Sequence, residues 1–384
     1  MIIYSIIAII LLFGVFHFDI RKNKVGLGVY YFITFVIMTL MTGLRYRVGG
    51  DALVYENYYS IYPDLKNFIR FLKFGNPLGY QPLWVLFVSI CKTFDPDYYF
   101  YQFFHAIFVN SILFWFVRKQ SKYPMSVMAV LYFLLFYFYF TFEIQREIMA
   151  ICCFLLGYNS FVNKRWLPYY FFAILAFLFH ISAVILFVLP FFRLIRFNYT
   201  FIIFFLLISL PLIFMNSLFL SILGPLLVTE EMSERAAVYS DVNFSLTGIF
   251  TFYFIRVVLF LPIIFYSSKR KLEYSWLFSA LLIISVLSQS LVGMERLLNY
   301  LFIPYIVLFV NFIYEDKIGL KLMSFKKRII IFVCFLHLFF VLEYKIFIAK
   351  DLRKGYYSVF FPYEDVFDKQ RSIERETYLI NLWK

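Results

Sequence analysis

Charged residues that could bind an anion or move a proton stand at a few places in an otherwise apolar chain. The first is GLRYRVGGDALVYENYY, residues 43–59, in which Arg45, Arg47 and Asp51 flank a Gly-Gly pair. Glycines let the backbone turn tightly and approach a ligand, and arginine presents a planar fork of donors that suits phosphate oxygens. The stretch is either an anion-binding loop or an aqueous loop whose charges are solvated.

Two further arginines begin apolar segments. Arg146 lies in FEIQREIMAICCFLLG with Glu143 and Glu147 at helical spacing, and Arg296 lies in LVGMERLLNYLFIPY beside Glu295. Each could contact an anionic ligand, form an internal ion pair or reach the membrane interface, because charges at helix ends are tolerated there.

His180 is the polar interruption of a long apolar stretch, FLFHISAVILF. Near neutral pH an imidazole can accept a proton or orient a hydroxyl, so His180 is a candidate base. The alternative is a histidine that only forms a structural hydrogen bond near a membrane turn.

Several other chemistries have little support. The acidic pair in DPD, Asp95 and Asp97, flanks a proline and is better explained as a turn than as a metal site. The four cysteines lack metal-ligand spacing, and the sequence contains neither a P-loop nor a nucleophile elbow. The aromatic residues lie inside apolar runs rather than in a solvated basic groove, so we expect no nucleic-acid partner.

The elements that must position these residues are membrane helices. Of 384 residues, 63% are hydrophobic, 24% aromatic and 15% charged. Apolar runs near bilayer length recur throughout, which predicts an all-α polytopic integral membrane protein, one domain over 1–384, with about 11 to 14 transmembrane or re-entrant helices. The clearest helices are Ile2–Phe18, Val25–Thr42, Tyr98–Val117, Pro124–Phe142, Ile144–Val162, Thr200–Leu220, Leu246–Tyr266, Tyr274–Leu291, Leu297–Tyr314 and Ile329–Ile348.

The net charge of +13 is explained by lysines and arginines in short connections, which positive-inside sorting places in the cytoplasm. All of these connections can face the cytoplasm if Trp84–Phe94 is a half-membrane or interfacial helix and Trp166–Phe192 crosses the membrane twice, with its turn near His180. Loops 43–82 and 221–245 and the charged tail 350–384 then face outward, on the same side as Arg146, His180 and Arg296.

These pieces taken together resemble the EpsG-like branch of the Wzy-type bacterial polysaccharide polymerases. The matching segments are GLRYRVGGDALVYENYY, QREIMAICCFLLG, FHISAVILFVLPF, ERLLNYLFIPY and FPYEDVF, in the family's order and over nearly the whole chain. In GYQPLW the chain has Gln81 where the family pattern leads us to expect an acidic residue, which weakens any acid role there.

The resemblance implies a GT-C-like membrane glycosyltransferase in the bacterial cytoplasmic (inner) membrane, with an outward-facing active site. Such an enzyme transfers a growing glycan from undecaprenyl diphosphate to a hydroxyl of a lipid-linked repeat unit, without a metal or other cofactor. Arg146 and Arg296, with Arg45 or Arg47 helping, would bind the diphosphate. Asp51 or His180 would orient or deprotonate the acceptor hydroxyl.

Other functions remain open at this point. An O-antigen-ligase-like transferase would use the same donor with a different acceptor. A transporter of lipid-linked oligosaccharide would favour an internal repeat and charges at the membrane midplane, and neither is visible here. A non-catalytic membrane scaffold would make the arginines incidental. For a polymerase of capsule, exopolysaccharide or O-antigen, the expected partners are lipid-linked oligosaccharides, membrane lipid, a chain-length regulator and a flippase.

Overall fold

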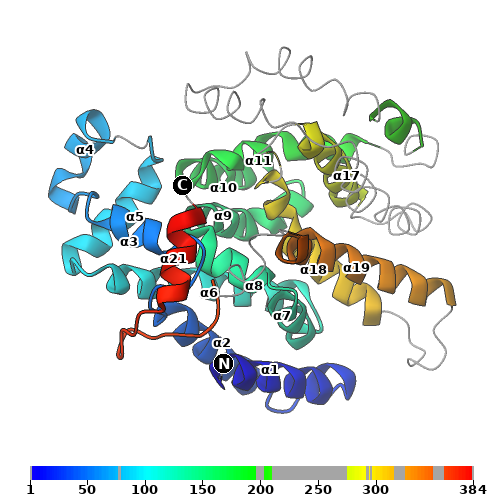
Figure 1. Ribbon diagram of the computed structural model, residues 1–384. Coiled ribbons are helices and arrows are strands. Elements are labelled where there is room, and N and C mark those ends of the chain that lie inside the picture. The colour runs from blue at the N-terminus through cyan, green and yellow to red at the C-terminus, as the bar shows by residue number, and fades with distance from the viewer. Residues whose placement is uncertain are drawn as a thin grey trace. The chain divides into compact units, whose positions relative to one another are not determined.

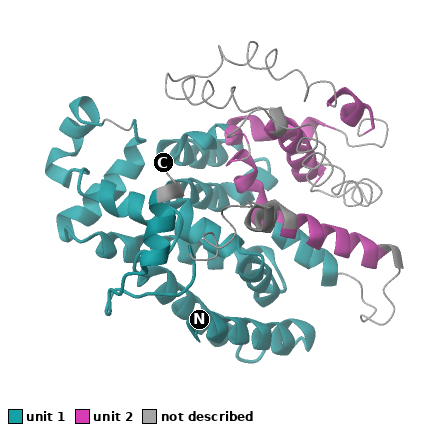
Figure 2. Ribbon diagram, viewed as in Figure 1, with its two compact units in different colours: residues 1–184, 306–314, 342–384 teal, residues 185–305, 315–341 magenta. Residues whose placement is uncertain are grey.

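The described part of the chain is helical. The computed structural model describes residues 2–76, 79–195, 203–209, 275–290, 294, 296–314, 325–348 and 359–382 (Figure 1). They divide into two compact units, one formed by residues 1–184, 306–314 and 342–384 and the other by 185–305 and 315–341 (Figure 2). The all-α polytopic membrane architecture is confirmed. A single membrane domain over 1–384 stays a prediction.

The first unit is built from helices that pack in pairs, some adjacent in the sequence and some far apart in it. Helix α1 (Ile2–Gly14) continues as the π-helix η1 (Val15–Ile20), and α2 (Leu27–Gly43) packs on α6 (Tyr98–Gln120). The helices α9 (Gln145–Val162) and α10 (Trp166–Phe179) form a closely packed hairpin. A Cβ atom on Gly157 would lie 2.8 Å from that of Phe172, so a larger residue would separate the two helices.

Three helices among the described residues are long and apolar enough to cross a membrane: Ile2–Ile20, Tyr98–Gln120 and Arg296–Tyr314. Shorter apolar helices, such as α2, α5 (Pro82–Phe94) and α10, accompany them. Thr200–Leu220 is described only over 203–209, which is helical, and Leu246–Tyr266 and loop 221–245 lie outside the described residues. The predicted total of about 11 to 14 helices includes these segments.

The predicted helix Pro124–Phe142 is broken. The chain forms α7 (Pro124–Phe133), then α8 (Phe136–Phe138) and the π-helix η3 (Tyr139–Glu143), with an 83° bend between the two parts. Leu135 has φ of 55°, which cannot continue a right-handed helix. Phe136, Phe140 and Phe142 are fully buried, and such a break is tolerated in a membrane protein where protein covers it.

The segment predicted as an external loop, 43–82, contains helices of its own. These are α3 (Ala52–Tyr59), the 3₁₀ turn η2 (Leu65–Asn67) and α4 (Phe68–Phe74), followed by α5 (Pro82–Phe94). Lys92 on α5 donates hydrogen bonds to the carbonyls of Tyr59 and Ser60 at 3.0 and 2.9 Å. Lys92 thereby satisfies carbonyls left open where α3 ends.

The long apolar stretch 166–192 is interrupted at His180, the residue at which the sequence predicted a turn. His180 has extended backbone angles, φ −154° and ψ 135°, and ends α10. The chain continues as η4 (Ile181–Ala183), α11 (Val184–Val188) and η5 (Leu189–Leu194). These pieces are too short for a second full crossing by themselves.

The second unit contains α17 (Ser275–Ser290), much of α18 (Arg296–Tyr314) and the larger part of α19 (Phe325–Ile348). The ring of Tyr305 on α18 lies edge-on to Phe278 of α17 and to His337 of α19, with ring centroids 6.3 Å apart in both cases. Aromatic contacts therefore join α17, α18 and α19.

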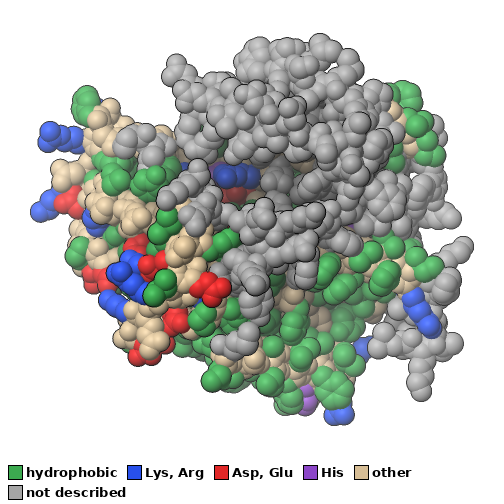
Figure 3. Space-filling model, viewed as in Figure 1, with side chains coloured by type: hydrophobic (Ala, Val, Ile, Leu, Met, Phe, Trp, Pro, Cys, Tyr) green, Lys and Arg blue, Asp and Glu red, His purple; other side chains and the backbone are tan. Residues whose placement is uncertain are grey.

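Within the first unit, the basic connections lie at one end of the helices and the 43–50 stretch lies at the other. Asp19 accepts a hydrogen bond from the backbone N–H of Ser126 at 2.6 Å, and Gln120 donates to Asn159 at 2.8 Å, which brings the connections 21–24, 118–122 and 163–165 to one end. At the opposite end, Gln102 donates to the carbonyls of Gly43 and Arg45. Figure 3 shows hydrophobic side chains over the region of α1 and charged ones gathered toward α3 and the C-terminal helix α21 (Ile373–Leu382).

Candidate functional site

Arg45 holds the turn that follows α2. Its side chain is 1% exposed, and its Nε donates to the Val48 carbonyl at 3.1 Å while another guanidinium nitrogen donates to the Thr42 carbonyl. The guanidinium carbon lies 4.5 Å from the ring centroid of Phe142, a cation–π distance. These contacts fix the path of residues 42–48 against the end of η3.

The two glycines place the loop directly on the same element. Gly49 has φ of +121°, and a Cβ atom there would come within 3.1 Å of both the Cβ and the carbonyl oxygen of Phe142. A Cβ on Gly50 would contact the Glu143 carboxyl group at 3.4 Å. Glycine is required at 49 because of both its backbone angle and its surroundings. The chain then enters α3 at Asp51, which is half-buried.

Arg47 is engaged by two carboxylates. Its Nε lies 2.8 Å from a Glu56 oxygen, and another guanidinium nitrogen lies 2.8 Å from an oxygen of Glu376. Burial alone would lower the pKa of Arg47, but the hydrogen bonds to Glu376 and Glu56 outweigh it and raise that pKa. Arg47 therefore links α3 to the C-terminal helix α21 (Ile373–Leu382).

The C-terminal segment pairs with the 43–50 stretch, so FPYEDVF and GLRYRVGG lie side by side. The backbone N–H of Tyr46 donates to the Glu364 carbonyl at 2.8 Å, and that of Gly49 donates to Val359 at 3.1 Å. An antiparallel bridge joins Arg45 to Asp365. On α21, Arg375 is 1% exposed and donates to the backbone carbonyls of Arg47 and Pro362.

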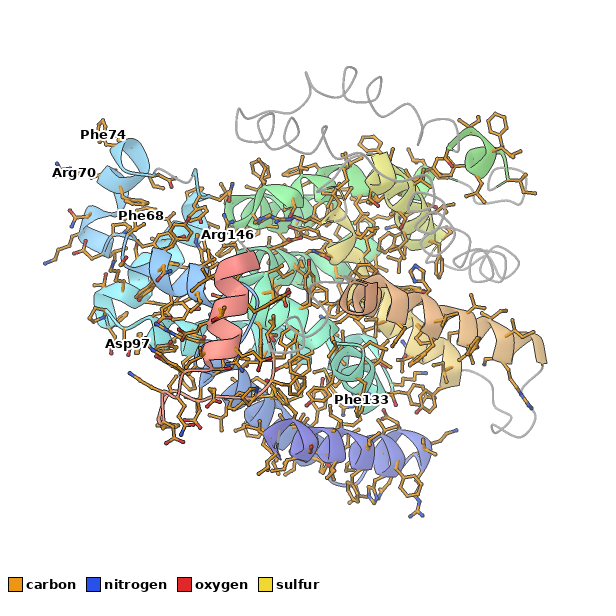
Figure 4. The ribbon with its side chains drawn as sticks, viewed as in Figure 1. Phe68, Arg70, Phe74, Asp97, Phe133 and Arg146 are labelled. Atoms are coloured by element: carbon orange, nitrogen blue, oxygen red, sulfur yellow. The ribbon has the colours of Figure 1, made fainter. Side chains whose placement is uncertain are left out.

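Arg146 is the second residue of α9 and is half-buried (Figure 4). Its guanidinium carbon lies 4.0 Å from the ring centroid of Tyr80, and Arg146 is close enough to Tyr55 to lower the pKa of that hydroxyl, which burial raises. Ile148 makes the first α-helical bond of α9, to Ile144. Arg146 therefore lies in the first turn of α9, where the N-terminal end of the helix dipole favours negative charge.

The Tyr80 ring that faces the Arg146 guanidinium belongs to an aromatic cluster with Tyr62 and Trp84. Tyr62 stacks on Tyr80 with ring centroids 5.8 Å apart, and Trp84, which is 1% exposed, donates its indole N–H to the Tyr62 hydroxyl at 2.8 Å. The side-chain oxygen of Gln81 is buried and has no hydrogen-bond partner among the residues that the structure describes. Tyr80 therefore has Arg146 and Tyr62 as neighbours, and Gln81 presents an acceptor next to it in the chain.

Gln145, the residue before Arg146, joins α9 to α6. Its side chain accepts from the Tyr101 hydroxyl at 2.9 Å and donates to that of Tyr98 at 3.0 Å, while its carbonyl lies 2.9 Å from Nε2 of His105. All four residues are buried. A fully partnered polar network of this kind specifies one arrangement, and here it fixes where α9 begins.

His180 is buried, with 5% exposure, and bonds within its own turn. Its Nδ1 lies 2.7 Å from the Ser182 hydroxyl and accepts the backbone N–H of Ser182 at 3.2 Å. Because α9 and α10 form a hairpin, the start of α9 and the end of α10 lie at the same end of the pair. Arg146 and His180 share that end.

The remaining predicted site residues have different settings. Arg296 begins α18, is exposed, and belongs to the second unit. Asp97 caps α6 by accepting the Tyr99 N–H at 2.9 Å, and Asp95 accepts the Asp97 N–H at 2.8 Å, which is the geometry of a turn. No group of three or more His, Cys, Asp or Glu side chains with metal-site geometry occurs among the described residues.

The structure thus brings both Asp51 and Arg146 close to Tyr55. Burial raises the pKa of the Tyr55 hydroxyl, the Asp51 carboxylate raises it further, and Arg146 lowers it. The structure turns Arg45 and Arg47 toward other protein groups. Sequence reasoning did not single out Tyr55, Tyr80 or the pairing of the C-terminal segment. The recurrence of tyrosines in YENYY and GYQPLW was the only signal that could have pointed to the first two.

The fold and the site define a class of protein: a polytopic all-α membrane protein with an arginine-centred polar site at one end of its helices. The EpsG family model matches residues 28–364, so this chain belongs to the EpsG family. Membership implies a polysaccharide polymerase of the glycosyltransferase kind. No curated protein and no solved structure gave a significant match.

Proposed function

We propose that this EpsG-family protein extends a polysaccharide at the outer face of the cytoplasmic membrane. It transfers a growing glycan from undecaprenyl diphosphate to a hydroxyl of a lipid-linked repeat unit. The observation that carries the proposal is Arg146, held half-buried at the N-terminus of α9 with Tyr80 beside its guanidinium. The sorting of basic connections to the opposite end of the first unit supports the outward orientation.

Arg146 suits a diphosphate that gains charge as its bond to the sugar breaks. A guanidinium offers paired donors to phosphate oxygens, and the N-terminal end of the α9 dipole, where Arg146 lies, favours negative charge. Partial burial strengthens such an interaction because less water screens it. The charge supplied by Arg146 takes the role that a metal ion would otherwise play in stabilising the departing diphosphate.

Arg45 and Arg47 take a supporting role in this proposal. The Arg45 guanidinium is directed at backbone carbonyls and Phe142, and Arg47 is shared by Glu56 and Glu376. Both arginines shape the loop that presents Asp51 beside Tyr55 and Arg146.

The transfer forms one bond and breaks another. The acceptor hydroxyl oxygen bonds to the anomeric carbon of the growing glycan, and the bond from that carbon to the diphosphate oxygen breaks. Asp51 or His180 takes the hydroxyl proton, and undecaprenyl diphosphate departs with the bonding electrons. Alignment of the two lipid-linked substrates contributes alongside proton transfer.

The test is reconstitution of the purified protein in nanodiscs with lipid-linked repeat units as both donor and acceptor. The proposal expects a ladder of polymers from the native protein and at least a 100-fold loss of rate for Arg146→Ala, because one charge-stabilising donor typically contributes about that much. Arg165→Ala is the matched control, since Arg165 is exposed at the other end of the α9–α10 hairpin. A single glycan added to a different acceptor would instead indicate ligase activity, and full activity of Arg146→Ala would refute the site.

A further inference from the structure

A short stretch between α3 and α5 exposes apolar and basic side chains next to one another. This 65–74 segment, LKNFIRFLKF, forms η2 and α4 and contains no acidic residue. Its exposed apolar residues are Leu65, Ile69 and Phe74, with exposed fractions between 46% and 85%, and its exposed cations are Lys66, Arg70 and Lys73. Figure 4 shows Arg70 and Phe74 pointing away from the rest of the ribbon.

The other side of the 65–74 segment is fixed to the protein. The backbone N–H of Leu65 donates to the Thr93 hydroxyl near the end of α5 at 2.8 Å, and the Asp64 carboxylate accepts the backbone N–H of Asn67 at 3.0 Å. The ring of Phe71 lies 6.3 Å from that of Tyr62. These contacts decide which side of α4 turns outward.

The 65–74 segment lies at the end of the first unit that is opposite the basic connections. Its partner Thr93 is followed by the Asp95 turn, which leads into the start of α6, and at that end of α6 Gln102 binds residues 43 and 45. Positive-inside sorting explains the cations at the other end but not three exposed cations here. Among the described residues, none of the three belongs to an ion pair.

A lipid surface explains this composition better than water or a partner protein does. Large apolar side chains exposed together mark an interaction surface, and a helix of seven residues with no buried residue is too short to be stable in water by itself. Protein interfaces are depleted in lysine. Segments that lie in a membrane interface combine lysine and arginine with large apolar residues, because the long cationic side chains reach the headgroups while their apolar neighbours enter the acyl region.

We propose that the 65–74 segment docks on the bilayer surface at this end of the protein. Leu65, Ile69 and Phe74 enter the acyl boundary, and the three cations bind the phosphate groups of anionic lipids. The inference rests on the membrane architecture and not on the transfer reaction.

Docking would also act on the neighbourhood of Arg146. The inner face of α4 contacts Tyr62 through Phe71, Tyr62 stacks on Tyr80, and the Tyr80 ring faces the Arg146 guanidinium at 4.0 Å. A docked segment therefore sets the height of the Tyr80 ring relative to the lipid phosphates.

The test places nitroxide spin labels on single introduced cysteines in the intact protein in phosphatidylglycerol nanodiscs. Collisions with oxygen, which dissolves among acyl chains, and with a water-soluble nickel chelate report the surroundings of each label. We expect labels at Ile69→Cys and Phe74→Cys to meet oxygen and exclude nickel, as a label at Ile9→Cys on the exposed face of α1 does. Thr377→Cys, at an exposed position of α21, is the control that nickel should reach. The native cysteines are buried, and the unmodified protein treated with the same reagent gives the background.

The charge of the segment is tested by comparing phosphatidylglycerol with phosphatidylcholine. Each lysine or arginine near an anionic surface shifts the ratio of docked to undocked segments roughly fivefold. A variant with Lys66→Gln, Arg70→Gln and Lys73→Gln should therefore lower that ratio roughly 100-fold in phosphatidylglycerol and leave it unchanged in phosphatidylcholine. Lys164→Gln with Arg165→Gln, at exposed positions at the other end of the first unit, should change neither.

Three results would overturn the inference. A Phe74→Cys label as open to nickel as the Thr377→Cys label would show that the segment stands in water. A label closed to both oxygen and nickel would show that protein, such as a second copy of this chain, covers it. A label that meets oxygen equally in both lipids, with or without the three cations, would remove their role. None of these measurements uses polymer formation, so the proposed function stands or fails separately.

Discussion

Replacing Gly49 with alanine should destabilise the protein strongly, because two separate costs coincide at that residue. Its φ of +121° is a conformation that residues with a Cβ atom rarely adopt, and the new methyl group would lie 3.1 Å from the Cβ and carbonyl oxygen of Phe142. The backbone term costs about 1–2 kcal/mol, and forcing Phe142 to move adds roughly 1–3 kcal/mol. We therefore expect a loss of about 2–5 kcal/mol in the free energy of unfolding, a large fraction of the stability of a typical domain.

Two other glycines separate these terms. Gly26 has φ of +77° with nothing within 4 Å of its Cβ position, so Gly26→Ala carries backbone strain alone. Gly28 has neither a positive φ nor a close neighbour, so Gly28→Ala carries neither cost. Denaturant unfolding in a fixed detergent should rank the losses Gly49→Ala, then Gly26→Ala, then Gly28→Ala. Equal losses for Gly49→Ala and Gly26→Ala would show that the loop does not rest on Phe142.

Three further substitutions test contacts around the site. Glu376→Gln should loosen α21 through its bond to Arg47 by about 0.2–1 kcal/mol, seen as faster proteolysis of the C-terminal segment, whereas Glu374→Gln, at an exposed position of the same helix, should not. Lys92→Met removes the donor to the carbonyls that end α3 and should lower the free energy of unfolding by about 1–3 kcal/mol; an equal effect of Lys66→Met, at an exposed position, would contradict that role. Gln145→Leu leaves two buried tyrosine hydroxyls without their partner, so it should lower both thermal stability and polymer yield, and native stability would count against the network.

The sequence predicted the helices well, because lipid exposure imposes long apolar runs whose ends are marked by charge. Helices beginning near residues 2, 25, 98 and 144 are confirmed, as is the interruption at His180. The break at Leu135 was missed because LYFLLFYFYF contains no glycine or proline. A non-glycine residue with positive φ is set by tertiary packing, and apolar periodicity does not reveal it.

At the site, the sequence predicted less than it did for the helices. Arg45, Arg47 and Arg146 were all predicted to bind the same diphosphate, but in the structure each of the three has different partners. The separation depends on contacts with Phe142, Glu376 and Tyr80, each of which lies far from its arginine in the sequence. Residue type and spacing give the chemistry available to a side chain, but its partners come from the fold.

The pairing of residues 359–366 with residues 44–49 has a consequence for the order in which the protein is made. The GLRYRVGG stretch leaves the ribosome early, yet its backbone N–H groups at Tyr46 and Gly49 find their acceptors at Glu364 and Val359, more than 300 residues later in the chain. Closing so long a loop is slow and comes late. A chain interrupted before residue 359 would lack those acceptors and the α21 carboxylate that holds Arg47, so the 43–50 stretch reaches the arrangement described here only after the C-terminal segment has been made.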